Sequence, residues 1–175
     1  EALKWAAKVQ EVFRGKTPEA LALFAETRIR IAQSDWAAAL SALGRLSELP
    51  DLGSTFPGGT NRPEVMFLRG FSLEQMQRYR EAVDEYLSIP DGRGEYYGGR
   101  ATERLQILSQ NPAAAPVISG RLNALTSVPQ PKDAEMQRKY LQSALRLTAD
   151  PQQRERLLGS LRKVYAVLPA YKNIP

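Results

Sequence analysis

The side chains that could do chemistry in this chain are carboxylates, arginines, lysines and tyrosines, because its 175 residues include no cysteine and no histidine. Zinc sites built on thiolate or imidazole ligands, and nucleophilic sites that pair serine or cysteine with histidine, are therefore excluded. Glu81, Asp84 and Glu85 lie close enough in sequence for general acid–base work. Because Arg78 and Arg80 accompany them, we interpret the group as surface ion pairs. We predict no catalytic residue, no metal site and no cofactor.

Two glycine-containing motifs raise other kinds of chemistry. The "YYGGR" motif at 96–100 could form an aromatic and arginine platform for nucleobases or sugar rings. The ordinary interpretation is the start of a helix, with one tyrosine buried, the other exposed, and glycines that allow close packing. The "GRG" motif at 92–94 lacks the spacing of a phosphate-binding loop and has no strand before it, so it indicates a turn.

Positive charge is concentrated toward the C-terminus. The net charge is +5, and residues 133–175 hold eight basic and four acidic side chains. The stretch "QRERLLGSLRK" at 153–163 could attract nucleic acid, but it is also typical of the solvated face of an amphipathic helix, which is our interpretation. Nucleic acid is therefore not a predicted partner. No run of about 18 apolar residues occurs, so no transmembrane segment is predicted.

The elements that must position these groups are helices. Alanine, leucine and arginine are abundant while β-branched residues are scattered, which favours helix over strand. Helix start signals occur at Thr17-Pro18 and Asp150-Pro151, and Asn111-Pro112 predicts another helix over about 112–127. We predict an all-α chain of about eight helices, arranged as a right-handed array of antiparallel helical hairpins.

The sequence pattern of one short helix occurs twice in the chain. Residues 34–50, "SDWAAALSALGRLSELP", are echoed by residues 78–90, "RYREAVDEYLSIP", with an aromatic residue three positions before an alanine and a bulky residue four positions after it. Stacked helical hairpins repeat in this way because one pair cannot bury its apolar face alone. The repeated positions are Trp36, Ala39 and Leu43 in the first copy and Tyr79, Ala82 and Tyr86 in the second.

Small residues precede both alanines by the same interval. Gly70 lies twelve residues before Ala82, and Thr27 lies twelve residues before Ala39. Equal intervals predict that the small side chains lie at equivalent helix contacts in two successive hairpins.

These residues resemble the tetratricopeptide repeat (TPR) family. Its pattern has a small residue on the first helix, an alanine twelve residues later, a bulky residue four beyond it and a proline near the end. Residues 66–91 match through proline at 90, and residues 23–51 match more loosely, with Thr27 in place of glycine. The alanines are 43 residues apart rather than the usual 34, a difference that an insertion at 51–62 would absorb.

The resemblance implies a domain organisation and a binding surface. It implies an N-terminal helix at 1–16, two to two and a half TPR-like units at 17–110, and C-terminal helical hairpins at 111–175 in the same domain. In this family the first helix of each pair lines a concave groove that suits a protein or peptide partner. The groove residues that it implies here are Phe24, Arg28, Glu64, Phe67, Phe71, Glu74 and Gln75. The alternative interpretation, which we favour for phenylalanines on helices, is that Phe24, Phe67 and Phe71 are core residues covered by adjacent helices. The lysine and asparagine that grip a peptide's C-terminal carboxylate in some members have no counterpart.

A fainter resemblance leads to an alternative. Residues 94–108, "GEYYGGRATERLQIL", are similar to a helix in the superhelical, non-catalytic region of bacterial soluble lytic transglycosylases. The chain would then be an accessory region of a larger cell-wall enzyme. It starts at Glu1 rather than methionine, as expected either of a processed protein whose targeting segment was removed or of a piece excised from a longer protein. Either bacterial compartment, periplasm or cytoplasm, stays open. Our main expectation is a non-catalytic scaffold for a protein partner or for a second copy of itself.

Overall fold

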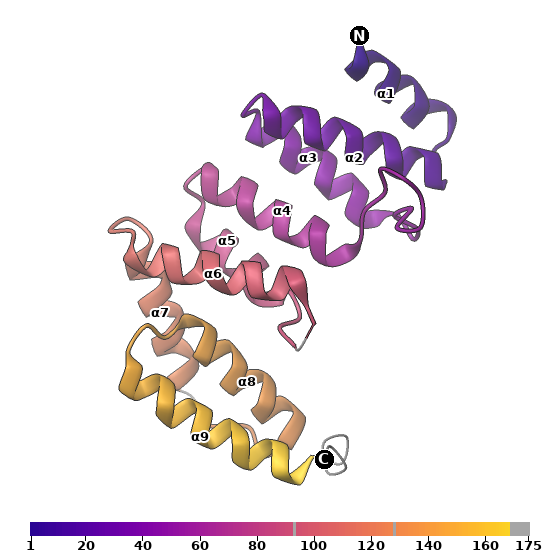
Figure 1. Ribbon diagram of the computed structural model, residues 1–175. Coiled ribbons are helices and arrows are strands. Elements are labelled where there is room, and N and C mark those ends of the chain that lie inside the picture. The colour runs from indigo at the N-terminus through magenta and orange to yellow at the C-terminus, as the bar shows by residue number, and fades with distance from the viewer. Residues whose placement is uncertain (93, 128, 169–175) are drawn as a thin grey trace. The chain divides into compact units, whose positions relative to one another are not determined.

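The chain is all-α. A computed structural model describes residues 1–92, 94–127 and 129–168, and in these ranges it contains nine helices and no strand (Figure 1). This confirms the predicted fold class. The helices are α1 (Ala2–Val12), α2 (Thr17–Ala32), α3 (Trp36–Glu48), α4 (Arg62–Gln75), α5 (Tyr79–Ser88), α6 (Tyr96–Gln110), α7 (Ala115–Thr126), α8 (Ala134–Leu147) and α9 (Pro151–Val167).

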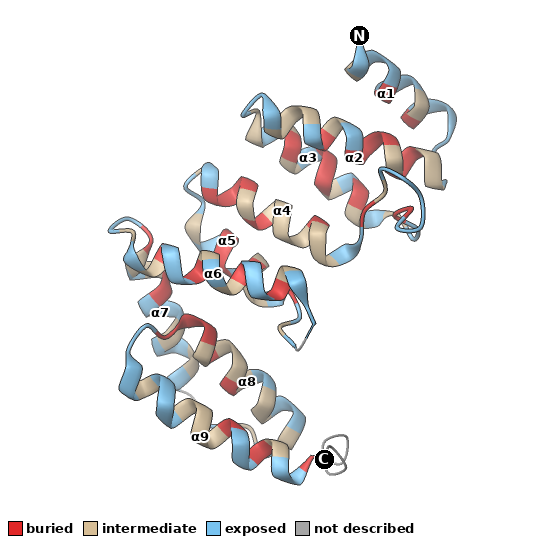
Figure 2. Ribbon diagram, viewed as in Figure 1, coloured by how far each residue is buried: buried red, intermediate tan, exposed pale blue. Residues whose placement is uncertain are grey.

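The helices form two compact units, Glu1–Pro90 and Asp91–Pro175. In each unit, helices that follow one another in sequence pack against one another. Along each helix, buried positions alternate with exposed ones, as expected of elements that cover a core with one face (Figure 2). No helix in the part of the chain that the structure describes has the length and apolar content needed to cross a bilayer.

The first unit contains two hairpins, α2–α3 and α4–α5, that turn in the same way. Ser34 has a φ of 57° and Gln77 a φ of 59°, and these residues are 43 positions apart, like Ala39 and Ala82. The amide after each of them closes the same turn, since Asp35 N donates to Arg30 O and Arg78 N to Leu73 O, both at 2.9 Å. A left-handed residue followed by a bond back to the third-last helical carbonyl is the Schellman way to end a helix.

The small residues at the repeated positions of these hairpins are buried. Thr27, Ala39, Gly70 and Ala82 are all buried. The hydroxyl of Thr27 donates to Leu23 O at 2.9 Å, so this buried polar group is satisfied within its own helix. The first hairpin contributes most of a core cluster made of Ala20, Leu23, Phe24, Ala42, Leu43, Leu46, Leu52 and Val65.

α1 is attached to the hairpins by a polar network. The Gln10 side chain, only 6% exposed, donates to Glu26 at 2.8 Å and accepts from Arg45 at 2.9 Å. Arg45 also donates to the buried carboxylate of Glu19 at 3.0 Å. Because buried polar groups are costly unless paired, these bonds hold α1, α2 and α3 in one arrangement.

The second unit contains α6 to α9, and one of its helices begins later than predicted. α7 starts at Ala115 instead of 112, because Asn111 initiates a turn in which its side chain accepts from Ala113 N at 2.9 Å. Pro116 then occupies the first turn of α7, where its missing N–H costs nothing. Asp133 and Asp150 cap α8 and α9 with their side chains.

Candidate functional site

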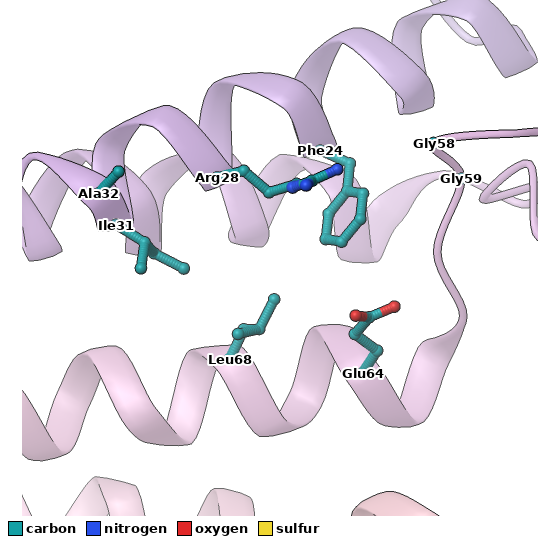
Figure 3. Close-up of a pocket in the computed structure, with 8 residues that line it drawn as sticks. All are labelled: Phe24, Arg28, Ile31, Ala32, Gly58, Gly59, Glu64 and Leu68. Atoms are coloured by element: carbon teal, nitrogen blue, oxygen red, sulfur yellow. The ribbon is translucent and has the colours of Figure 1, made fainter.

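A hollow of about 600 Å³ opens in the first unit between α2 and α4 (Figure 3). It is lined by Phe24, Arg28, Ile31, Ala32, Gly58, Gly59, Glu64 and Leu68, and we call it the α2–α4 pocket. The volume lies in the range of small-ligand sites in proteins. Three separate stretches of chain build it, namely α2, α4 and the loop at 51–62.

The floor of the α2–α4 pocket is apolar. Phe24 belongs to the core cluster and is 6% exposed, so its ring is a fixed wall rather than a mobile one. Leu68 packs against the same cluster, and Figure 3 shows it pointing from α4 toward Phe24 and Ile31 on α2. An apolar side chain that enters here would meet surfaces held in place by the core beneath them.

Arg28 supplies positive charge at the α2 side of the pocket. Its side chain is exposed, and it has no ion pair or hydrogen-bond partner in the described ranges. Some other arginines of the first unit are engaged, such as Arg45 with Glu19 and Arg69 with Glu85 at 2.7 Å, whereas Arg14 and Arg80 are exposed and, as Arg28 does, lack a partner among the described residues. The Arg28 guanidinium therefore has all five N–H donors available to a ligand.

Glu64 supplies negative charge at the α4 side. One of its carboxylate oxygens accepts from the Thr60 hydroxyl at 2.7 Å, which leaves the other oxygen available. Asn61 caps α4 by accepting from Glu64 N at 2.9 Å, so the backbone at this point is also fixed. Arg28 and Glu64 form no ion pair with each other.

The loop at 51–62 forms the third wall, and it is anchored at both ends. Leu52 and Thr60 are buried, and Thr60 N donates to Leu52 O at 3.2 Å. Gly59 lies so close to Gly53 that a Cβ on Gly59 would be 1.8 Å from the Gly53 carbonyl oxygen. Glycine is therefore required at position 59, where the two ends of the loop approach each other closely. The loop forms an ordered wall of the pocket.

A side-chain contact holds this loop to α2. The Thr17 hydroxyl donates to Asp51 at 2.6 Å, and Gly53 N donates to the other Asp51 oxygen at 2.9 Å. The hydrogen bond from Thr17, followed by that from Gly53, lowers the pKa of Asp51 below that of a free aspartate. The ionised carboxylate thus ties the start of the loop to the start of α2.

The structure brings three of the predicted groove residues together in this pocket: Phe24, Arg28 and Glu64. Two others pack on neighbouring rings instead. Phe67 is half-buried with its ring centroid 5.9 Å from that of Tyr86, and Phe71 is half-buried with its ring edge-on to Trp36 at 5.7 Å. Such contacts stabilise packing between helices.

The last two predicted groove residues also lie outside the pocket. Glu74 is buried, and it accepts a hydrogen bond from the Tyr86 hydroxyl at 2.8 Å, so it serves the contact between α4 and α5. Gln75 is exposed at the end of α4.

The three carboxylates considered for acid–base work lie elsewhere on the first unit. They contribute to a second hollow, of about 320 Å³, where Glu85 pairs with Arg69 and Glu81 with Arg78. The hydrogen bond with Glu81 raises the pKa of Arg78, and the same bond lowers the pKa of Glu81. Among the residues that the structure describes, no group of three or more histidine, cysteine, aspartate or glutamate side chains could hold a metal ion.

In the second unit, the "YYGGR" motif begins α6. Tyr96 is 68% exposed and Tyr97 is half-buried, and their rings meet edge-on with centroids 5.0 Å apart. Gly98 is buried, so one of the two glycines lies at a packed position. The basic stretch at 153–163 is on α9, where Arg162 lies 3.9 Å from Glu155 and both side chains are exposed.

Five pocket residues were not predicted from the sequence: Ile31, Ala32, Gly58, Gly59 and Leu68. The available signal was the loop at 51–62, which is long for a helical domain and rich in glycine. The resemblance to TPR proteins implies that this loop is an insertion between units. In the structure the loop borders the pocket.

No protein-family model, no curated protein sequence and no solved structure matches this chain.

Proposed function

We propose that this chain is a non-catalytic scaffold that holds a segment of a partner protein in the α2–α4 pocket. The observation that carries the proposal is the pocket itself, an apolar floor bordered by two charged groups and an anchored loop. Ligand sites in proteins commonly combine an apolar surface with a few fixed polar groups. A volume of about 600 Å³ suits a few residues of a peptide segment rather than a whole domain.

Preorganisation is the proposed mechanism. The loop is closed by backbone hydrogen bonds and by the Thr17–Asp51 contact, and Phe24 and Leu68 rest on the core. A ligand that enters does not have to order these walls, so less binding free energy is lost. In this proposal α2 and α4 are the first helices of two TPR-like units, and the pocket is part of their concave surface.

The test is selection of peptides from a displayed library of random twelve-residue sequences on the intact chain, followed by a variant that blocks the pocket. Ala32 is exposed near the end of α2, so Ala32→Trp fills the pocket mouth without disturbing the core. Ala37→Trp is the matched control, since Ala37 is equally an exposed helical alanine but lies outside the pocket.

Peptides that bind the wild-type chain and Ala37→Trp but not Ala32→Trp would support the proposal. Circular dichroism and thermal unfolding should be unchanged within about 0.5 kcal/mol in both variants, as for other exposed substitutions. Selected peptides that bind all three proteins equally, or a selection that yields none, would rule the α2–α4 pocket out as the site.

The accessory-region alternative remains a prediction. It depends on an enzymatic domain encoded elsewhere in the gene, and reading the gene beyond codon 175 tests it directly. A glycosidase-like domain there would favour the alternative, whereas further helical hairpins would favour the scaffold.

A further inference from the structure

The helix α1 carries three rows of side chains, and within each row the residues are three or four positions apart. The first row is buried at Ala6 and Gln10, where α1 packs against α2. The second row, which we call the α1 stripe, consists of Trp5, Val9 and Val12. Trp5 is 64% and Val12 62% exposed, and Val9 is half-buried. α1 therefore presents an apolar stripe beside the face that it buries.

An apolar stripe is unusual at this place in the fold. Figure 1 shows α1 at one end of the first unit, beside α2. The outermost element of a helical stack is normally polar on its outer side, because no further element covers it. Exposed apolar side chains that are contiguous, as in the α1 stripe, mark an interaction surface.

The third row of α1 is charged and lies on the other side of the α1 stripe. Lys4, Lys8 and Glu11 each precede a stripe residue by one position, so they lie about 100° around the helix from it. The Nζ of Lys8 is 5.8 Å from the centre of the Trp5 ring, so this cation borders the stripe. Lys4 pairs with Glu1 at 3.7 Å, and both side chains are exposed. Glu11 is exposed and has no ion pair or hydrogen bond within the described ranges.

The order of charge along this row favours a helix as the partner over a uniformly anionic surface. A membrane or a nucleic acid would attract a row that is basic throughout, and Glu11 would oppose both. A helix whose charges run in the opposite order would instead meet each charge with its opposite. An antiparallel copy of α1 has this order.

We propose that the α1 stripe is a contact surface for a second copy of this chain, with the two α1 helices antiparallel. A two-fold axis near Val9 brings Trp5 of each copy against Val12 of the other. The same axis brings the two charged rows side by side, so that Lys4 and Lys8 of one copy lie near Glu11 of the other. Opposite charges then meet at two symmetric places, as in an isologous interface.

A parallel pair of α1 helices does not offer this match. Its two-fold axis runs along the helices, so the charged row of one copy would face the buried row of the other. That row already packs against α2 within its own chain. The arrangement of the three rows therefore selects the antiparallel pair.

The contact is small, so the dimer is weak. α1 has eleven residues and is about 16 Å long. A standard interface buries roughly 800 Å² on each partner, which is more than one face of such a helix provides. We expect a dissociation constant of about 10–100 µM. The inference goes beyond the proposed function, because no residue of α1 lines the α2–α4 pocket.

Sedimentation velocity of the intact chain at about 5–500 µM measures the association. Val12→Lys places a charge in the α1 stripe and should weaken dimerisation at least about tenfold, because the ammonium group loses water on contact. Ala7→Lys is the matched control, since Ala7 is exposed on the opposite side of α1, and this variant should dimerise like the wild type. Both positions are exposed, so circular dichroism should be unchanged.

Exchange of charges tests the antiparallel arrangement. Lys4→Glu combined with Lys8→Glu makes the charged row acidic throughout, and Glu11→Lys makes it basic throughout. Each of these proteins alone should dimerise at least about tenfold more weakly than the wild type, because like charges then face each other. An equimolar mixture of the two should associate at least as strongly as the wild type, since every charge meets its opposite.

Three results would each overturn the inference: a chain that stays monomeric throughout this concentration range, equal association of the wild type and Val12→Lys, or a mixture that associates no better than its components. If phosphatidylglycerol vesicles bound the wild type but not Val12→Lys, while the chain stayed monomeric, the stripe would be assigned to a membrane instead. Peptide binding in the α2–α4 pocket should be the same in all these variants, so failure of this inference leaves the proposed function standing.

Discussion

The ring of Tyr86 occupies the space that a side chain at position 70 would fill. A Cβ built on Gly70 would lie 2.7 Å from Cε1 and 2.8 Å from Cδ1 of this ring, and the Tyr86 hydroxyl is held by Glu74 at 2.8 Å. At the equivalent positions, 43 residues earlier, the chain has Thr27 and Leu43. A larger residue on the first helix is thus matched by a smaller one on the second, which keeps the filled volume similar.

Gly70→Ala should therefore destabilise the first unit. We expect a loss of about 1–3 kcal/mol in the free energy of unfolding, because the new methyl group overpacks the contact with Tyr86. Gly44→Ala is the matched control, since nothing lies within 4 Å of a Cβ at this helical position. It should gain up to about 1 kcal/mol from the higher helix propensity of alanine. Thermal unfolding of both variants measures the difference.

A second substitution tests the cause. Tyr86→Leu places at position 86 the residue that the first hairpin has at position 43. It should lower the free energy of unfolding by less in the Gly70→Ala background than in the wild type, because it relieves the overpacking. Equal costs in both backgrounds would mean that the Gly70–Tyr86 contact does not limit packing.

Substitution by glycine at the left-handed residue should stabilise both hairpin turns. Ser34 and Gln77 have left-handed backbone angles that cost an L-residue about 1–2 kcal/mol. Ser34→Gly and Gln77→Gly should each raise stability by about 0.5–1 kcal/mol after the larger entropy of glycine in the unfolded chain is subtracted. Denaturant unfolding measures both. Destabilisation by either one would show that the replaced side chain makes a contribution larger than the backbone strain.

Gly59→Ala should disrupt the loop and leave the helices intact. The added Cβ would collide with the Gly53 carbonyl oxygen, so residues 53 and 59 could not approach each other as they do at the base of the loop. Far-ultraviolet circular dichroism should be nearly unchanged, while amide exchange at Thr60, which donates to Leu52, should become much faster. Peptides that depend on the α2–α4 pocket should no longer bind. Retained binding would mean that the loop is not one of the walls that the ligand uses.

The contact between Asp51 and Thr17 should weaken only in acid. Because folding lowers the pKa of Asp51, its contribution is fully present above the unfolded value of about 3.9 and is lost as pH falls through the lower folded value. The amide signal of Gly53, which donates to Asp51, should titrate in nuclear magnetic resonance spectra with a midpoint below 3.9. Asp51→Asn should abolish this titration. A midpoint at or above 3.9 would contradict the hydrogen bonds that Asp51 accepts from Thr17 and Gly53.

Arg146 should be the most sensitive charged residue of the second unit. It is 5% exposed, its Nε donates to Thr102 at 2.8 Å, and Asp91 lies 3.6 Å away. Burial lowers the pKa of its guanidinium, and the charge of Asp91 opposes this effect. Arg146→Ala should lower the free energy of unfolding by about 2–3 kcal/mol. This loss is smaller than for a fully buried ion pair because Asp91 is partly exposed. Arg162→Ala, in an exposed pair with Glu155, should change stability by under about 0.5 kcal/mol.

The helical class and most helix starts could be predicted because their causes are local. Alanine and leucine content, proline in the first turn and capping side chains act within a few residues of the backbone that they favour. Asp150 and Pro151 start α9 as predicted. Asn111 and Pro112 carry the same signal, yet the chain makes a turn there and α7 begins at Ala115. A local signal favours a helix start, and the following residues decide its position.

The left-handed turn residues could not be predicted. Neither Ser34 nor Gln77 is glycine, so their residue types do not indicate a positive φ. The requirement arises because each turn must return the next helix onto the previous one, and packing between the two helices outweighs the local strain.

By itself, the amino-acid sequence determined that the chain is helical, that it lacks the ligands and nucleophiles of histidine and cysteine chemistry, and that small residues recur at matching intervals. Only the tertiary structure decided which side chains share a site. Phe24, Arg28 and Glu64 meet in a pocket while Phe67 and Phe71 pack on Tyr86 and Trp36. The physical reason is that propensity and periodicity act along the chain, whereas a pocket depends on how α2, α4 and the loop at 51–62 approach one another in space.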